Sequence, residues 1–302
     1  MHRRAIVLMV LAATLWSTAG VVTRHLSPDL QSQGRFEITF WRSLFAGLTV
    51  AAYLLFIKRE GMRPVLAAGR AGLLSGLCWA TMYCAFMLAL TLTTVANTLI
   101  VMSVGPLLTA LLARAVLRTP VAARTWFAIA VAMIGMTAMV AHGAAQPAGP
   151  TNLLGLAIAF AVPVAAAINL VTLQKTRAHV DLVPAVFLGG AISAVAVLPF
   201  AVPFQASAHD VLLLAALGVF QLGVPCTLMV MAARSLSATE ISLLALLEVV
   251  LGPLWAWLGA GETPAAVTLA GGAVVLGALV FNELAPRQRR AAIATGGSAG
   301  SR

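Results

Sequence analysis

Runs of about 20 predominantly apolar residues follow one another along almost the whole chain, separated by short polar connections. A run of that length crosses the roughly 30 Å hydrocarbon layer of a membrane as one helix. Hydrophobic residues make up 61% of the chain and charged residues only 9%, whereas a soluble domain carries about a quarter charged residues. The sequence therefore predicts an all-α integral membrane protein with lipid around most of its surface.

The apolar runs divide into ten predicted transmembrane helices. The first run follows Arg3 and Arg4 as a signal peptide would, but nine more runs follow and no clear cleavage site ends it, so we interpret it as a span. The predicted spans are approximately 5–22, 36–57, 71–90, 95–117, 125–141, 153–173, 183–204, 211–233, 238–260 and 265–284.

The basic residues predict the orientation of these spans. The net charge is +10, but the basic residues lie in short clusters between apolar runs, which argues against a nucleic-acid partner. Sixteen of the 19 lysines and arginines fall near the chain ends or in even-numbered connections; the exceptions are Arg24, Arg35 and Arg42. Because basic connections stay in the cytoplasm, we expect both termini on the cytoplasmic side of the cell inner membrane.

The chain also divides into two similar halves. The fourth and ninth spans each contain a Gly-Pro-Leu sequence, at Gly105 and at Gly252. Five spans is an odd number, so the second half must cross the membrane in the opposite direction to the first. Inverted repeats are typical of transporters, with the substrate site near the midplane between them. We expect repeats at 1–142 and 143–284 around a central cavity, and a disordered basic cytoplasmic tail at 285–302.

Five short segments resemble one family of transporters. They are Leu15-Trp16-Ser17, Phe40-Trp41-Arg42, the span-4 sequence from Ser103 to Leu112, Leu246-Leu247-Glu248 with Trp255 to Leu258, and Gly261-Glu262. Together the chain from Ala5 to Leu284 resembles the drug/metabolite transporter superfamily, specifically its EamA-type members with two five-helix repeats. The sequence departs from that pattern at Thr119, where a glutamate is usual, and at Val249, where a proline is usual.

The resemblance implies a ten-helix carrier with a central cavity and peripheral fifth and tenth spans. Such proteins export or import amino acids, nucleosides, drugs or other small metabolites. We therefore expect a secondary transporter that moves a small metabolite, an amino acid or related compound, outward by alternating access. The expected partners are the small-molecule substrate and membrane lipids, with protons as a candidate coupling ion; a homodimer is left open.

Two charged residues lie within predicted spans. Glu248 is near the centre of span 9, where an ionised carboxylate must be neutralised, paired or reached by water. It is a candidate for proton coupling or for binding a substrate amine, the alternative being a hydrogen-bonded packing group. Arg42 is a candidate to bind substrate or to pair with Glu248. Since it lies near one end of span 2, it could instead reach the interface as an anchor.

Other candidate substrate-binding residues are aromatic or carry an amide. Trp79 and Tyr83 share one helix face because they are four residues apart, and with Trp16 they could form an aromatic wall. Each could instead simply pack between helices or anchor at the interface. The candidate amides are Asn97, Asn169 and Gln221, which could orient a substrate or join neighbouring helices.

Prolines within spans predict helix bends, since each removes a backbone hydrogen bond. The predicted bends are at Pro106, Pro163, Pro225 and Pro253, where bending could serve alternating access or only fill space. We expect no metal and no cofactor, because Cys78, Cys84 and Cys226 lie in apolar runs without CxxC spacing and no HExxH occurs.

A membrane-embedded enzyme and a channel are the competing hypotheses. An enzyme acting on a lipid-linked substrate would need a catalytic cluster, and the sequence has neither HExxH nor GxSxG. A channel would normally show a filter loop or a ring of charges, and neither is visible. There is no Walker A motif for ATP-driven transport. The sequence thus favours a carrier, not an enzyme.

Overall fold

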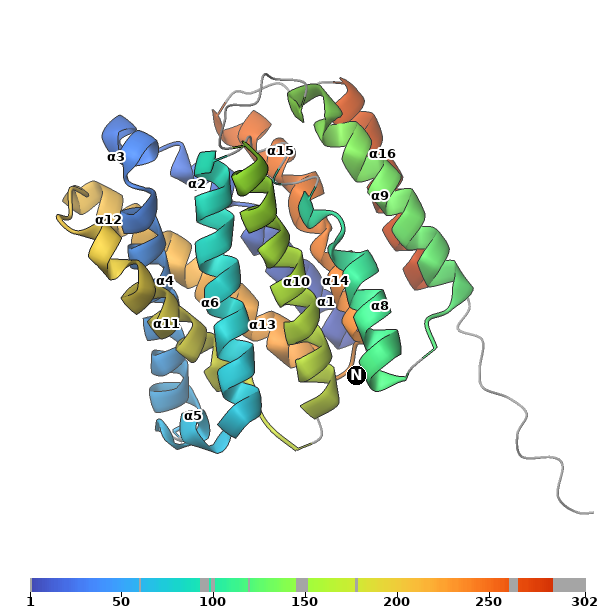
Figure 1. The fold of residues 1–302 in the computed structure, drawn as a ribbon, viewed down its shortest axis with the longest axis horizontal. Coiled ribbons are helices and arrows are strands. Elements are labelled where there is room, and N and C mark those ends of the chain that lie inside the picture. Colours follow the sequence, from blue (N-terminus) through green and yellow to red (C-terminus); the bar gives the residue numbers. More distant parts are fainter. Residues whose placement is uncertain are drawn as a thin grey trace, which may run out of the picture.

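Every regular element of the described chain is a helix in the structure, a computed structural model (Figure 1). The structure describes residues 2–59, 61–92, 98, 101–118, 120–144, 152–176, 179–260 and 266–284. The predicted tail at 285–302 and the candidate residue Asn97 lie outside these ranges, as do Thr119, Gly261 and Glu262.

The helices follow one another through short connections along the chain. In the first half they are α1 His2–Trp16, α2 Ala19–Thr23, α3 Pro28–Gln33, α4 Arg35–Ala52, the π-helix η1 Tyr53–Ile57, α5 Arg63–Ala67, α6 Gly69–Leu92, α8 Gly105–Leu117 and α9 Ala123–Ala144. In the second half they are α10 Asn152–Thr176, α11 Val183–Ala201, α12 Ala208–Ala216, the π-helix η2 Leu217–Gly223, α13 Val224–Ala232, α14 Ala238–Ala245, α15 Leu247–Ala260 and α16 Ala266–Leu284.

Seven helical runs of the described chain are long and apolar enough to cross a membrane, by length and composition. They coincide with the predicted spans one to three and six to nine. Three shorter apolar helices, Gly105–Leu117, Ala123–Ala138 and Leu269–Asn282, coincide with predicted spans four, five and ten. The prediction of an all-helical membrane protein is confirmed, and the number of ten spans stays a prediction.

Short polar sequences start two of the helices in the second half. Ser207 accepts a hydrogen bond from the backbone N–H of Asp210 (3.1 Å), while the carboxylate of Asp210 accepts from the backbone N–H of Ser207. Ser237 and Glu240 make the same reciprocal pair at the start of α14. Each pair satisfies two backbone donors that a helix N-terminus leaves without a partner, so the register of α12 and of α14 follows from the sequence.

The helices pack in long, closely spaced pairs. α4 lies along α11, α6 lies between α10 and α11, α1 packs on α13, and α8 packs on α10. α4 and α11 approach closely at Gly190, where an added Cβ would lie 2.7 Å from the backbone oxygen of Ser43. Close backbone approach of this kind drives helix association in lipid, where the hydrophobic effect between helices is absent.

The pair α9 and α16 lies at one edge of the bundle (Figure 1). These helices pack along each other, with Thr125 Oγ1 donating to Asn282 Oδ1 at 3.0 Å, and have few contacts with the remaining helices. An added Cβ on Gly135 of α9 would lie 2.9 Å from the backbone oxygen of Gly271 in α16. This is the peripheral position that the family resemblance implies for the fifth and tenth spans.

Several of the apolar runs are interrupted near the middle of the bundle. α1 ends at Trp16 and a turn at Ser17 and Thr18 precedes α2; a turn likewise precedes α8, and Leu246 separates α14 from α15. In lipid an interrupted helix is tolerated only where protein or a water-filled cavity satisfies its backbone groups. The interruptions therefore indicate where a cavity should lie.

Candidate substrate cavity between the two halves

A cavity of about 200 Å³ lies between the two halves of the chain. Its walls come from α1, α4 and α6 of the first half and from α10, η2, α13, α14 and α15 of the second. Seven of the eight residues predicted from the sequence to bind substrate or couple ions line it, and the eighth, Asn97, is not described. The seven are Trp16, Arg42, Trp79, Tyr83, Asn169, Gln221 and Glu248.

α6 supplies a large share of the wall. Trp79, Met82, Tyr83, Phe86 and Met87 all line the cavity, and their spacing of three and four residues places them on one face of the helix. The rings of Trp79 and Tyr83 are 5.8 Å apart between centroids, and the Tyr83 hydroxyl donates to the Cys226 sulfur at 3.3 Å. This face is apolar and aromatic, with sulfur-bearing side chains that adapt readily to the shape of a ligand.

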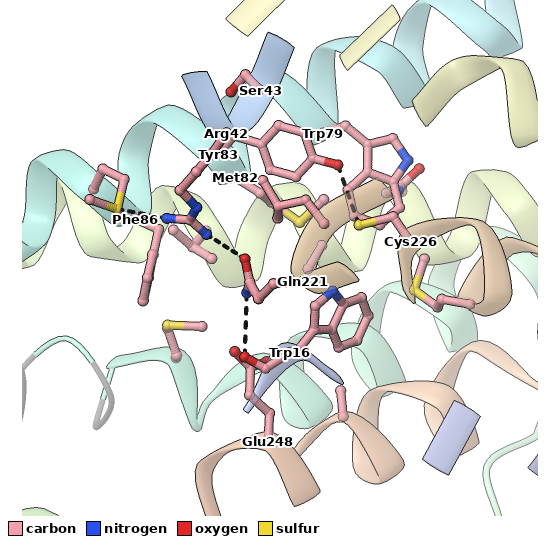
Figure 2. A pocket seen from close by; sticks show the side chains of 18 of the residues that line it. Trp16, Arg42, Ser43, Trp79, Met82, Tyr83, Phe86, Gln221, Cys226 and Glu248 are labelled. Atoms are coloured by element: carbon pink, nitrogen blue, oxygen red, sulfur yellow. Dashed lines mark hydrogen bonds between the residues drawn. The ribbon is translucent and has the colours of Figure 1, made fainter. Parts of the chain in front are cut away.

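Arg42 is buried in the bundle and does not reach the interface, because only 6% of its surface is exposed. Its Nη2 donates to Gln221 Oε1 at 2.6 Å, and its Nη1 lies 3.1 Å from the sulfur of Met87. Gln221 in turn donates through Nε2 to the backbone oxygen of Trp16 at 3.3 Å. This chain of hydrogen bonds joins α4 and η2 to the carbonyl at the end of α1 (Figure 2).

Glu248 lies in the first turn of α15, directly after the interruption at Leu246. A carboxylate is favoured there by the partial positive charge of a helix N-terminus. Within the described chain its side chain has no hydrogen bond and no ion pair, and it does not pair with Arg42. Gln221 lies between the two in the view of Figure 2. The interruption thus brings an unpaired carboxyl group to the cavity wall.

The chain is similar to solved structures and to one family of known proteins. No curated protein matches the chain significantly. Among solved structures 29 chains match, one of them described only as "Crystal structure of protein", with a TM-score of 0.78 and 18% identity over 95% of this chain and 100% of the other. At that identity the likeness shows the fold alone. The EamA-like transporter family matches residues 3–141 and 153–283, nearly the whole chain.

The chain belongs to the EamA-like transporter family.

The resemblance read from short motifs is therefore confirmed, and the protein is a multi-pass membrane protein of a transporter family within the drug/metabolite transporter superfamily. In this EamA-like protein the two matched segments lie on either side of the stretch at 142–152. Each matched segment contributes helices to the cavity wall.

The helix interruptions of this EamA-like protein coincide only in part with its prolines. Pro106 lies at the start of α8 and Pro225 at the start of α13, directly after η2, so both mark a change of helix. α10, by contrast, continues as one helix through Pro163. The interruption in span 9 lies at Leu246 and not at the predicted Pro253, which falls inside α15. Pro253 and Pro163 thus lie within continuous helices.

Trp255 has a role that the sequence did not suggest. Its indole Nε1 donates to Ser17 Oγ at 2.7 Å. The contact ties α15 to the turn that follows α1. No sequence pattern pairs residues so far apart; only the packing of the ninth span against the first shows the contact.

An ion cluster joins the two halves outside the membrane-spanning helices. Asp181, between α10 and α11, accepts from Lys58 Nζ at 2.5 Å and pairs with Arg234 at 2.9 Å. Burial raises the pKa of Asp181, but hydrogen bonds from Lys58, from the backbone N–H of Val183 and from Arg234 outweigh it, so the pKa lies below its ordinary value. Lys58 belongs to the first matched segment and the other two residues to the second.

Proposed function

We propose that this protein is a secondary transporter that carries a small metabolite, an amino acid or related compound, out of the cell across the inner membrane. The observation that carries the proposal is the cavity itself, which both halves line and which holds the buried Arg42 and the unpaired Glu248. Charged groups within a membrane bundle are costly and face substrate or ion pathways. The cavity is smaller than the roughly 300–1,000 Å³ of drug-sized sites, which suits a small substrate.

In this proposal the chain forms ten spans in two inverted repeats, 1–142 and 143–284, with both termini in the cytoplasm. The packing supports it. When each span is exchanged for the one five places away along the chain, many pairs of contacting helices become other contacting pairs. The pairs α6–α10 and α8–α10 become α13–α1 and α14–α1, and α4–η2 becomes α11–α6. The pairs α4–α11, α8–α14 and α9–α16 map onto themselves.

Alternating access requires that the cavity be closed on one side at a time. On the side of the N-terminus a continuous buried cluster extends from the cavity residues Met229 and Ile241 to Met9 and Leu236, both fully buried. The ion cluster around Asp181 also joins the two halves outside the spans. Both features support a conformation closed toward the proposed cytoplasmic face, with a rocking of one repeat against the other opening it.

Transport in liposomes tests the proposal. We would screen radiolabelled amino acids, nucleosides and sugars, with and without an imposed pH gradient, using wild-type protein and Glu248→Gln. We expect saturable flux that a pH gradient increases in the wild type and no longer increases in Glu248→Gln. Glu240→Gln, which changes a helix-capping acid outside the cavity, is the matched control and should keep the response. Linear, unsaturable flux would contradict a carrier.

A further inference from the structure

Three buried nitrogen donors on the cavity-lining residues have no hydrogen-bond partner within the described chain. They are Nε of Arg42, Nε1 of Trp79 and Nδ2 of Asn169, on side chains that are 6%, 4% and 1% exposed. All three residues line the same cavity, from α4, α6 and α10. Buried donors are almost always paired, so three orphans around one cavity indicate a ligand that brings acceptors.

Two of these donors form one end of the cavity. The Ser75 hydroxyl donates to Asn169 Oδ1 at 2.6 Å, which leaves Nδ2 as the free group of that amide. Ser75 and Trp79 are one helical turn apart on the same face of α6, so Asn169 and Trp79 occupy adjoining positions. An indole N–H can only donate. This end, the Trp79–Asn169 end, therefore offers two neutral donors and suits an uncharged acceptor such as a carbonyl oxygen.

Arg42 forms the other end. Its guanidinium contacts Met87, which lies eight residues beyond Trp79 on α6, or about 12 Å along the helix axis. The hydrogen-bond partners of Arg42, Gln221 and Met87, are both neutral, and no acid of the described chain lies within ion-pair distance of it. A buried cation without a direct ion-pair partner is costly, and a carboxylate matches the paired donors of a guanidinium.

Between the two ends the α6 side of the cavity wall is apolar and aromatic. Met82, Tyr83 and Phe86 lie there on α6, at positions between Trp79 and Met87 in the sequence. Figure 2 shows Tyr83 and Met82 between Arg42 and Trp79. A ligand that satisfies both ends therefore lies along this face and suits an apolar body between its polar groups.

We propose that the cavity binds a two-ended solute, with a carboxylate on Arg42 and an uncharged hydrogen-bond acceptor at the Trp79–Asn169 end, joined by a short apolar body. The inference rests on the proposed function in taking this cavity as the substrate site. It deepens that function by naming the substrate class.

Binding of a matched six-carbon series to the purified protein in detergent tests the proposal. Adipic acid monoamide has both groups, hexanoate only the carboxylate, hexanamide only the acceptor, and 6-aminohexanoate an ammonium in place of the acceptor. We expect the monoamide to bind most tightly, about tenfold above hexanoate, since a single well-made hydrogen bond supplies close to the free energy of a tenfold change. Hexanamide should bind more weakly than hexanoate, and 6-aminohexanoate more weakly than the monoamide, because an ammonium cannot accept from the two donors at the Trp79–Asn169 end.

The variant Trp79→Phe removes one donor and keeps an aromatic ring. It should reduce the affinity for the monoamide to nearly that for hexanoate and leave hexanoate unchanged, whereas Arg42→Gln should weaken both carboxylates and spare hexanamide. Trp41→Phe is the matched control, because the indole N–H of Trp41 already donates to Glu37 and lies outside the cavity lining. Thermal unfolding of each variant confirms that it is folded.

Several outcomes would overturn the two-ended site. They are equal affinities for the monoamide and hexanoate, tightest binding of 6-aminohexanoate, no binding of any of the four compounds, or a Trp79→Phe variant that weakens hexanoate and monoamide alike. The liposome assay is separate. End-specific binding without saturable flux would leave the site in place and contradict transport, and saturable flux of compounds without a carboxylate would leave transport in place and contradict this site.

Discussion

Arg42 and Glu248 show how residues of opposite charge can share a cavity without pairing. Arg42 donates to the neutral amide of Gln221, and the same amide donates onward to the end of α1. Glu248 is left on another part of the wall, at the start of α15. Because the two charges form no direct ion pair, each is available to a substrate or a proton. Gln221 therefore connects Arg42 to the end of α1.

Replacing Gln221 with leucine tests its role. The substitution removes the acceptor of a buried guanidinium, so we expect the free energy of unfolding to fall by about 2 kcal/mol. Thermal or denaturant unfolding in detergent would measure it. Gln205→Leu changes an exposed glutamine and should have little effect. An unchanged stability of Gln221→Leu would mean that Arg42 finds another acceptor at no cost.

Many of the residues that line the cavity could be predicted one by one from the sequence. Glu248, Arg42 and the amides stand out because polar groups are rare in spans, and the face of α6 follows the three- and four-residue spacing of a helix. Met82, Phe86 and Met87 have the same spacing from Trp79, so the pattern would have found them. Met229 and Ser242 could not be predicted to line the cavity, because small or apolar side chains occur on every face of a buried helix.

At the scale of elements, close approach and interruption shape the bundle. α4 and α11 touch at Gly190, and α1, α8 and α15 begin or end beside the cavity. The prolines indicated two of the helix changes, at Pro106 and Pro225. The interruption at Leu246, between α14 and α15, has no proline or glycine directly beside it. It depends on tertiary packing and could not be predicted from local sequence.

Gly190→Ala should separate α4 from α11. The new Cβ would lie 2.7 Å from the backbone oxygen of Ser43 and 2.9 Å from the backbone nitrogen of Gly47, neither of which can rotate away. We expect a loss of about 1–3 kcal/mol in unfolding free energy, as for overpacked cores. Gly277→Ala is the control, because a Cβ added there would meet nothing within 4 Å. Equal stability of the two variants would contradict the close approach.

The ion cluster around Asp181 predicts a pH dependence of stability. Because the pKa of Asp181 is lowered in the folded protein, its stabilisation is complete above the ordinary value of about 3.9 and is lost as the pH falls through the lowered pKa. The unfolding temperatures of wild type and Asp181→Asn should differ near neutral pH and converge under acid. Asp29→Asn, at an exposed acid, serves as control. A difference that persists at the lowest pH would contradict the ionic origin.

At the scale of the whole molecule, composition and the length of the apolar runs were enough to predict an all-helical membrane protein. Long apolar runs leave only helices as spanning structures, because every backbone group in lipid must be satisfied within the chain. The pairing of distant helices, such as α1 with α13, follows from how the two halves interlock and is not encoded in any single run. The sequence similarity between the halves is weak, so their relation is clearer in the contacts than in the residues.

The cavity between the two halves is, in the proposed function, the site through which substrate passes. Filling it is the most direct test, and α10 offers a matched pair: Ala166 lines the cavity and Ala157 is exposed on the same helix. Saturable flux in liposomes should be abolished in Ala166→Leu and retained in Ala157→Leu, with both variants folded. Flux of Ala166→Leu with an unchanged KM and kcat would place the transport path elsewhere.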